Sequence, residues 1–347
     1  MRKLRATLGL VVLIGFEALI GLPQAARAQH SFRDPFLDEQ QVASEETPPE
    51  TAGPAPVDYT RLRQECFDSA QPSAVGPIED CGWSLTDTLS VFVGLDGSKQ
   101  PKDFGINASF GGRLSANAGI PLIEEYGLGL QVGSAVNYAD NAVAVLAAVD
   151  GRSERFQSFT TVGLFQRFES GFEWAVAYDF LYENYYDAIA LSQFRGRATQ
   201  VVGDSNKFGV LGIWSWDDQR VSVAGQSVLL RPIDQVSAVW NHLWASGIET
   251  EVWGGVALGH GQVVAVFPGN PGINTAPVFG AMLHAPLNDW LALYGQGNFI
   301  LPADSGTVDA YLGFVVYFDK PQRARYSRYS PVFDVANNTS FAVDLRR

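Results

Sequence analysis

The chain has 347 residues, of which 46% are hydrophobic and 18% charged, and its formal net charge is −13. This composition excludes a disordered or fibrous protein, and the length allows one large domain or two ordinary ones. The acidic balance, with no basic patch, argues against a nucleic-acid partner.

The first 28 residues have the parts of a secretory signal peptide. A basic start is followed by an apolar run from Leu8 to Leu22, and Ala26–Ala28 fits an A-x-A cleavage site. We expect export and cleavage after Ala28. The alternative is a retained membrane anchor, which is disfavoured because the run is short and contains Glu17.

Residues 29–83 form an acidic, Pro-rich segment, in which Glu39–Asp58 has no apolar period and is expected to be extended or disordered. The residues that follow, 59–83, are expected to form a small ordered collar held by a disulfide. It holds Cys66 and Cys81, the two cysteines of the chain. After export they would meet an oxidising compartment, which predicts one disulfide; two free thiols are the alternative. Two cysteines without nearby histidines do not indicate a zinc site, and we expect neither a metal nor another cofactor.

Residues 84–319 alternate between apolar and polar side chains, the period of half-buried strands. Many of these runs are longer than the five or six residues usual in soluble sheets and suit the 9–11 residues of a membrane strand. We therefore predict an all-β fold, a transmembrane antiparallel up-and-down β-barrel of about twelve strands. The expected strands lie near residues 85–94, 105–119, 126–138, 154–168, 172–184, 190–202, 206–216, 233–246, 248–260, 276–286, 289–301 and 307–318.

The connections between these strands alternate in length. "PLIEE", "ESG", "GDSN", "ASG" and "PLND" are short, whereas "ADNAVAVLAAVDGRSER", "DDQRVSVAGQSVLLRPI" and "GQVVAVFPGNPGINT" are long. Alternating short turns and long loops is the outer-membrane pattern, with the short turns on the periplasmic side. "ADSGT" is short where a long loop would fit, and it weakens the pattern slightly.

The two faces of the strands differ in chemistry. Between Phe172 and Tyr182 every second residue is large and apolar or aromatic, and the residues between them are mostly small or acidic. We assign the apolar face to lipid and the other face to the barrel interior. A soluble sandwich would also alternate, but large aromatics gather near the strand ends, as in the interfacial girdles of barrels. The expected girdle residues are Tyr126, Trp174, Trp244 and Phe318 at the turn side and Tyr138, Tyr182 and Trp216 at the loop side.

The charged side chains of the interior face are the candidate functional residues. Such charges either line an aqueous path or pair across a filled lumen, and about twelve strands allow either. Glu249 and Glu251 are expected to be the least compensated, because the neighbouring strands offer no basic interior residue. The expected pore-lining residues are Arg113, Glu173, Asp179, Glu183, Arg195, Arg197, Glu249, Glu251 and Asp309.

Three stretches, "WSLTDTLSVFVGLDGSKQPKDFG", "GRATQVVGDSNKFGVLGIWSWDD" and "SPVFDVANNTSFAVDL", carry a family resemblance over roughly residues 80–347. In them the chain resembles a family of predicted outer-membrane β-barrel proteins of unassigned function from planctomycete bacteria. The resemblance implies a barrel and no particular activity.

The function expected from these observations is that of a porin-like passive channel for small hydrophilic solutes in the outer membrane. A closed structural barrel that anchors the envelope is the alternative, and a membrane-embedded hydrolase is a weaker one. We predict no enzyme, because no Ser, His and orienting group converge at the barrel rim. The expected partners are outer-membrane lipid, the barrel-assembly machinery and small hydrophilic solutes, and the oligomeric state stays open. The C-terminal residues 320–347 are expected to form a periplasmic tail.

Overall fold

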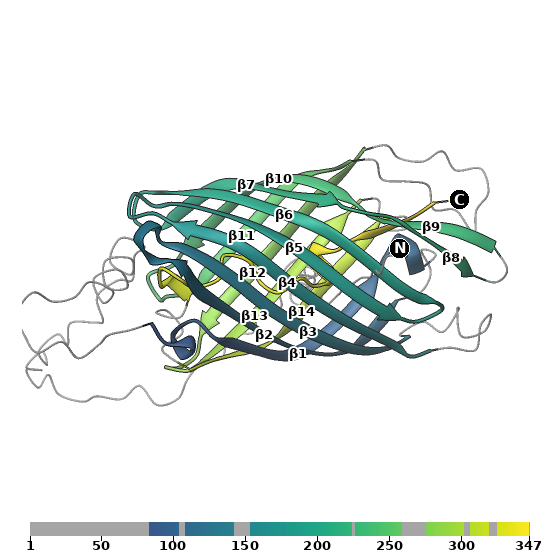
Figure 1. Ribbon diagram of the computed structural model, residues 1–347, viewed down its shortest axis with the longest axis horizontal. Coiled ribbons are helices and arrows are strands. Elements are labelled where there is room, and N and C mark those ends of the chain that lie inside the picture. The colour runs from purple at the N-terminus through teal and green to yellow at the C-terminus, as the bar shows by residue number, and fades with distance from the viewer. Residues whose placement is uncertain are drawn as a thin grey trace, which may run out of the picture.

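The computed structural model describes residues 83–103, 108–141, 153–223, 226–258, 275–301, 306–318 and 325–346. Its main body is a closed antiparallel barrel in which β1 pairs with both β2 and β14 (Figure 1). The predicted twelve-stranded up-and-down barrel is therefore confirmed. The barrel strands are β1 (Ser90–Lys99), β2 (Ser109–Ile123), β3 (Leu128–Asn141), β4 (Arg155–Arg167), β5 (Phe172–Asn184), β6 (Ala188–Val202), β7 (Asn206–Ser215), β10 (Asp234–Leu243), β11 (Glu249–Leu258), β12 (Thr275–Pro286), β13 (Leu291–Ile300) and β14 (Thr307–Tyr317).

A second, three-stranded sheet has the order β15-β9-β8. The link after β7, which was expected to be a loop, forms β8 and β9. The end of the chain forms β15. The remaining elements are β8 (Gln219–Val223), β9 (Gln226–Pro232), β15 (Val343–Arg346) and the 3-10 helices η1 (Leu85–Asp87), η2 (Pro101–Asp103), η3 (Glu124–Tyr126) and η4 (Asn338–Ser340).

The two ends of the barrel differ. We call the end with the connections after β2, β4, β6, β10 and β12 the turn end, and the opposite end the loop end. Gly171 and Gly247, in the turns after β4 and β10, have φ values of 90° and 80°. Such left-handed backbone favours glycine, which explains how these turns reverse the chain so tightly. The sheet of β8 and β9 extends beyond the loop end (Figure 1).

The first strand lies about five residues later in the chain than the sequence analysis predicts. Leu85–Asp87 is a 3-10 turn, in which the carboxylate of Asp87 accepts from the N–H of Ser84, rather than the start of a strand. The strand instead continues through Asp96 and Ser98, whose side chains are buried inside the barrel. The "DG" pair at 96–97 resembles a turn, but the pairing of Gly97 with Phe110 and Ala310 keeps it within the sheet.

The outer surface of the barrel is apolar. Along β5 the outward residues alternate with buried ones, and Val176 is 48% exposed while its neighbour Ala177 is 1% exposed. Exposed apolar side chains recur on the outward face of other strands, for example Phe208, Val210 and Phe314. Within the described ranges, no helix combines the length and the apolar character needed to cross a membrane.

Candidate functional site: the lumen and the C-terminal tail

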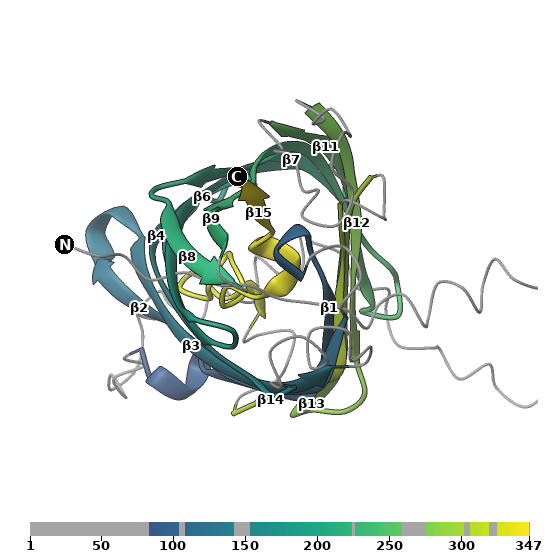
Figure 2. The same ribbon diagram turned by 90° about the vertical axis from the view of Figure 1, so that its right-hand side faces the viewer.

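The lumen holds the end of the chain itself. We call residues 325–346 the C-terminal tail; seen along the barrel, this yellow segment lies within the ring of strands (Figure 2). At the turn end, Arg325 pairs with Glu249. At the loop end, β15 pairs with β9, with Val343 opposite Pro232 and Arg346 opposite Leu229. The tail therefore runs the length of the barrel, and the expectation that it lies outside, on the periplasmic side, is wrong.

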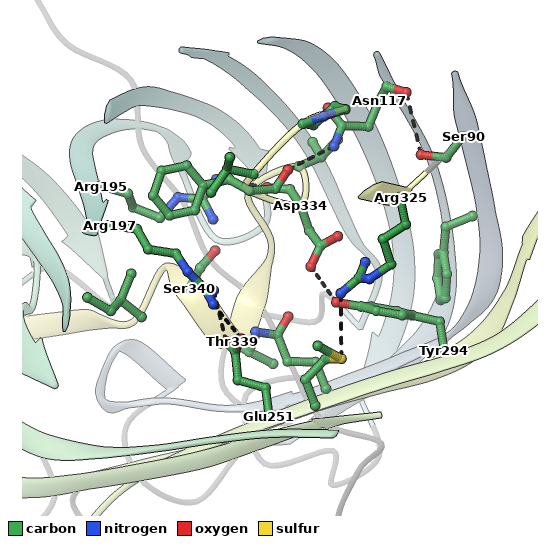
Figure 3. Close-up of a pocket in the computed structure, with 18 of the residues that line it drawn as sticks. Ser90, Asn117, Arg195, Arg197, Glu251, Tyr294, Arg325, Asp334, Thr339 and Ser340 are labelled. Carbon is green, nitrogen blue, oxygen red and sulfur yellow. Dashed lines mark hydrogen bonds and ion pairs between the residues drawn. The ribbon is translucent and has the colours of Figure 1, made fainter. Parts of the chain in front are cut away.

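The wall formed by β2 and β3 binds the main chain of the tail. The side-chain amide of Gln131 donates to the carbonyl of Phe333 at 2.6 Å, and the N–H of Phe333 donates back to its Oε1 at 3.2 Å. Asn117 donates to the same carbonyl at 2.9 Å (Figure 3). Both hydrogen-bonding groups of one tail residue are thus satisfied by barrel side chains.

The same pattern continues along the tail. Arg195 donates to the carbonyl of Asp334 at 2.9 Å, and Gln193 donates to that of Ser340 at 2.7 Å. Figure 3 shows Arg195 of the wall and Ser340 of the tail among the residues that line the pocket. The N–H of Ala336 donates to the hydroxyl of Thr161 at 2.7 Å. The tail therefore needs no strand ladder inside the barrel, because side chains of the wall take the place of a partner strand.

Glycines on the wall give the tail room. A Cβ added at Gly119 would collide with the main-chain carbonyl of Tyr329, and one at Gly133 would lie 2.5 Å from a methyl of Val335. Any larger residue at these two positions would push the tail away from β2 and β3. The small residues of the inward face, which the sequence analysis attributes to a confined interior, thus allow a close approach of two backbones.

The tail also forms its own local structure. Asn337 caps η4, since its side-chain oxygen accepts from the N–H groups of Thr339 and Ser340 at 2.9 and 3.2 Å. Asn338 then donates to Asp96 on β1 at 2.5 Å. A side-chain cap of this kind is worth about 1 kcal/mol and fixes the turn at η4, which the sequence alone leaves unassigned.

All nine predicted pore-lining residues point into the barrel; eight are buried, and the side chain of Arg197 is 13% exposed. Each forms an ion pair or a hydrogen bond with another buried group, so these residues do not form an unpaired charged surface along the lumen. Asp179 pairs with Arg195 at 2.5 Å, and Arg113 donates to the carbonyls of Val335 and Ala336. The remaining partners are Lys207 and Arg167 for Glu173, Lys102 and Arg155 for Glu183, Arg197 for Glu251, Arg325 for Glu249 and Gln100 for Asp309.

The expectation that Glu249 and Glu251 lack compensation is wrong. Arg197, on β6, reaches Glu251 on β11 with two hydrogen bonds of 2.9 and 2.5 Å. Arg325 of the tail supplies the partner of Glu249. Strand neighbours alone do not predict these pairs, since one partner lies on β6, beyond both β10 and β7, and the other comes from the tail.

A buried ion cluster lies at the loop end, and the sequence analysis missed it. Lys102 of η2 contacts Glu183, and Arg155 contacts both Asp103 and Glu183. The guanidinium of Arg155 also lies 4.6 Å from the ring centre of Tyr185. Lys102 and Asp103 lie in a connection between two strands, where the alternation of side chains gives no information. The adjacent opposite charges after Pro101 were the available signal.

A cavity remains between the tail and the opposite wall (Figure 3). Its empty volume is about 1490 Å³, which includes space open to solvent. Apolar and polar groups share its lining, among them Trp253, Met282 and Tyr311, and the amide nitrogens of Gln235 and Asn298 have no hydrogen-bond partner among the described residues. In the same part of the chain, no three His, Cys, Asp or Glu side chains gather as a metal ion would require.

The aromatic residues predicted for the girdles lie at the two ends of the barrel. Tyr126 and Trp244 are exposed at the turn end, and Tyr138 and Trp216 at the loop end. Trp174 and Tyr182 are half-buried, and Phe318 is exposed just after β14. Cys66 and Cys81 lie outside the described residues, so the disulfide stays a prediction.

The closed antiparallel barrel, its apolar outer face and its polar, filled interior define an outer-membrane-type β-barrel. The family model described as "Family of unknown function (DUF6666)" matches residues 88–343, and the chain belongs to this family. The match covers both the barrel and most of the tail. The planctomycete origin stays a prediction.

Among curated proteins, no match was found. Several solved structures match the chain at low identity. One, described as "Unveiling the Mechanism Behind the in-meso Crystallization of Membrane Proteins", is 11% identical, with 74% of this chain and 100% of that chain covered and a TM-score of 0.45. The transport unit of the autotransporter AIDA-I from Escherichia coli is 10% identical, with 73% and 97% covered and a TM-score of 0.37. The β domain of the Bordetella autotransporter BrkA is 9% identical, with 66% and 98% covered and a TM-score of 0.36. No residue role is carried over from these likenesses.

Proposed function

We propose that the protein is an outer-membrane β-barrel that its own C-terminal tail closes in the resting state. The observation that carries this proposal is the course of the tail, from Arg325 at the turn end to β15 at the loop end, with its main chain bonded to the wall. A closed envelope barrel fits this filled lumen better than the freely open porin that the sequence analysis favours. The proposal includes no catalytic step.

In this proposal the signal peptide directs export and the barrel-assembly machinery inserts the chain. The apolar outer face then meets outer-membrane lipid, and the turn end faces the periplasm. The tail enters the lumen from the periplasmic side, because β14 ends at the turn end. The long loops and the sheet of β8 and β9 then face the outside of the cell and are the parts available for contact with other envelope components.

A porin-like channel for small hydrophilic solutes is the second candidate. The cavity beside the tail favours it, since it extends along β7 and β10–β14 and has charged residues in its lining. A passage there would be narrow and would depend on the position of the tail.

Conductance recording in planar lipid bilayers separates the two candidates. Full-length protein, refolded in detergent and shown to be folded by its heat-dependent gel mobility, is added to the bilayer at high salt. The closed barrel predicts a silent bilayer over long recordings. Regular single-channel steps from the same folded sample would reject the closed barrel and support the porin-like channel.

A further inference from the structure

We propose that the inner wall formed by β2–β6 is a binding groove for a peptide segment, and that the C-terminal tail is a separable ligand of this groove. The inference rests on the proposed function. In it, the barrel is closed when the tail is bound to the groove and open when the tail has dissociated. It predicts that the same tail sequence binds the barrel when it is supplied as a separate peptide.

The first support is that the groove recognises main-chain groups. Gln131 pairs with both the N–H and the carbonyl of Phe333, as a neighbouring peptide unit in a sheet would. The contacts that Arg195, Gln193 and Thr161 make to the tail also go to backbone atoms. Strand addition to a sheet edge uses the same main-chain hydrogen bonds to bind extended peptides. Here side chains of an inner barrel wall supply the hydrogen bonds.

The second support is a pair of buried aromatic anchors. The ring of Phe333 lies 4.7 Å from the guanidinium of Arg195 and packs in one cluster with Phe165, Ala175 and Ala177. Phe341 is completely buried, with its ring centre 6.3 Å from that of Phe159. Main-chain hydrogen bonds are tolerant of sequence, so the two anchors, eight residues apart, would supply the selectivity.

The third support is that the barrel does not need the tail in order to close. β1 and β14 pair in unbroken register from Ser90 opposite Tyr317 to Lys99 opposite Val308. The strand pairing of the tail, between β15 and β9, belongs to the separate three-stranded sheet, whose apolar side chains pack in one cluster with Phe159 and Leu181 of the wall. The cavity along the opposite wall also leaves space beside the tail. The tail can therefore leave without breaking a barrel strand pair.

The ligand class follows from these contacts. The groove takes a peptide with free main-chain N–H and carbonyl groups, two phenylalanines at the spacing of Phe333 and Phe341, and the Asn337-capped turn between them. Between Ser330 and Leu345 the tail carries only Asp334 and Asp344 as charged residues. Few charges lower the desolvation penalty of entry into the lumen.

The test uses the full chain. A site for a specific protease is inserted between Phe318 and Arg325, the protein is folded, and the chain is then cut at that site. A labelled synthetic peptide of residues 325–347 is added, and its binding and the release of the cut tail are followed by fluorescence anisotropy and gel filtration. The groove predicts that the cut tail remains with the barrel and is replaced by the labelled peptide, whereas a scrambled peptide of the same composition does not bind.

Two variants sharpen the result. Gln131→Leu removes both hydrogen bonds to Phe333 and should weaken peptide binding about tenfold. Gln235→Leu makes the same change at a lumen position that has no hydrogen bond to the tail among the described residues, and should leave binding unchanged. Because Gln131→Leu alters the barrel itself, a peptide with Phe341→Ala tested on the unchanged barrel provides an independent measure and should also bind at least tenfold more weakly.

Two results would overturn the groove. The cut tail could stay in place and never exchange, which would make it a fixed part of the core, or it could leave while the labelled peptide fails to bind the folded barrel. Neither result touches the closed resting state, which is tested by the bilayer recording of the uncut protein. Channel steps from the uncut protein would instead reject the proposed function, whatever the peptide does.

Discussion

Arg197 on β6 and Glu251 on β11, two strands that are separated by β7 and β10, form two hydrogen bonds of 2.9 and 2.5 Å. The two strands are not neighbours in the barrel order, so the pair ties together parts of the wall that no strand ladder joins. A bidentate pair of this kind holds a fixed geometry and shields both charges from the apolar lining of the lumen.

Glu251→Gln should destabilise the barrel, because it leaves Arg197 buried without a carboxylate. Breaking a buried pair from one side costs roughly 3 kcal/mol. Denaturant unfolding in detergent, followed by tryptophan fluorescence, measures the loss. The double variant Arg197→Met/Glu251→Leu is the control and should recover most of the stability, because neither charge is left alone. A Glu251→Gln protein as stable as the unchanged one would contradict the assigned pair.

Val176→Arg should impair insertion into lipid. Val176 is 48% exposed on the outer face, and an arginine near the bilayer midplane costs about 2–4 kcal/mol there. Folding yield into vesicles, read from heat-modifiable gel mobility, measures the effect. Ser237→Arg is the matched control, since Ser237 lines the cavity, and it should fold in higher yield.

Ala177 also points inward, but it is an unsuitable control for the outward orientation of Val176. It is 1% exposed and packs in one cluster with Phe333 of the tail. An arginine at this position should displace the tail as well as strain the wall. Equal yields for Val176→Arg and the unchanged protein would show that Val176 does not face lipid.

Gly119→Ala should loosen the tail and leave the barrel intact. The added Cβ collides with the carbonyl of Tyr329, and overpacking of this kind costs roughly 1–3 kcal/mol. Cleavage of the tail by a protease should become about tenfold faster, since cleavage follows the population of the open form. Gly112→Ala on the same strand is the control, because a Cβ there meets no described atom within 4 Å. Equal cleavage rates in the two variants would contradict the close approach.

Cys66 and Cys81 should be oxidised in the mature protein, because the chain is expected to be exported. Alkylation before reduction should label neither cysteine, and alkylation after reduction should label both. Mass spectrometry counts the labels. Complete labelling before reduction would remove the predicted disulfide.

The alternation of side chains was sufficient to predict the barrel. In β3 and β5 this alternation predicts which residues face outward, because every second side chain of a membrane strand contacts lipid and is therefore apolar. The tail could not be predicted in the same way, since its partners are side chains scattered over the wall and its own main chain has no regular period. Its composition was the one available signal: a solvated periplasmic tail needs more charge than Asp334 and Asp344 supply between Ser330 and Leu345.

The strands β8 and β9 were missed for a related reason. They pair with each other, and β9 also pairs with β15, so neither belongs to the barrel wall and the long alternation of the wall strands does not extend into them. The alternation of side chains was also insufficient to predict the charge pairs. The inward orientation of Arg197 and Glu251 could be predicted from the strand alternation. Their pairing could not, because it joins β6 to β11, which are not neighbours in the barrel.

Hydrogen exchange of the tail amides in the folded, full-length protein tests the central claim most directly. The N–H groups of Phe333, Ala336 and Val343 are bonded to Gln131, Thr161 and Gln100 at 3.2, 2.7 and 2.9 Å, all within buried surroundings. Amides protected in this way exchange only when the segment opens. A lumenal tail predicts that peptides covering residues 333–343 exchange many times more slowly than the same sequence as a free synthetic peptide. Exchange as fast as in the free peptide, in protein whose barrel strands stay protected, would contradict the account.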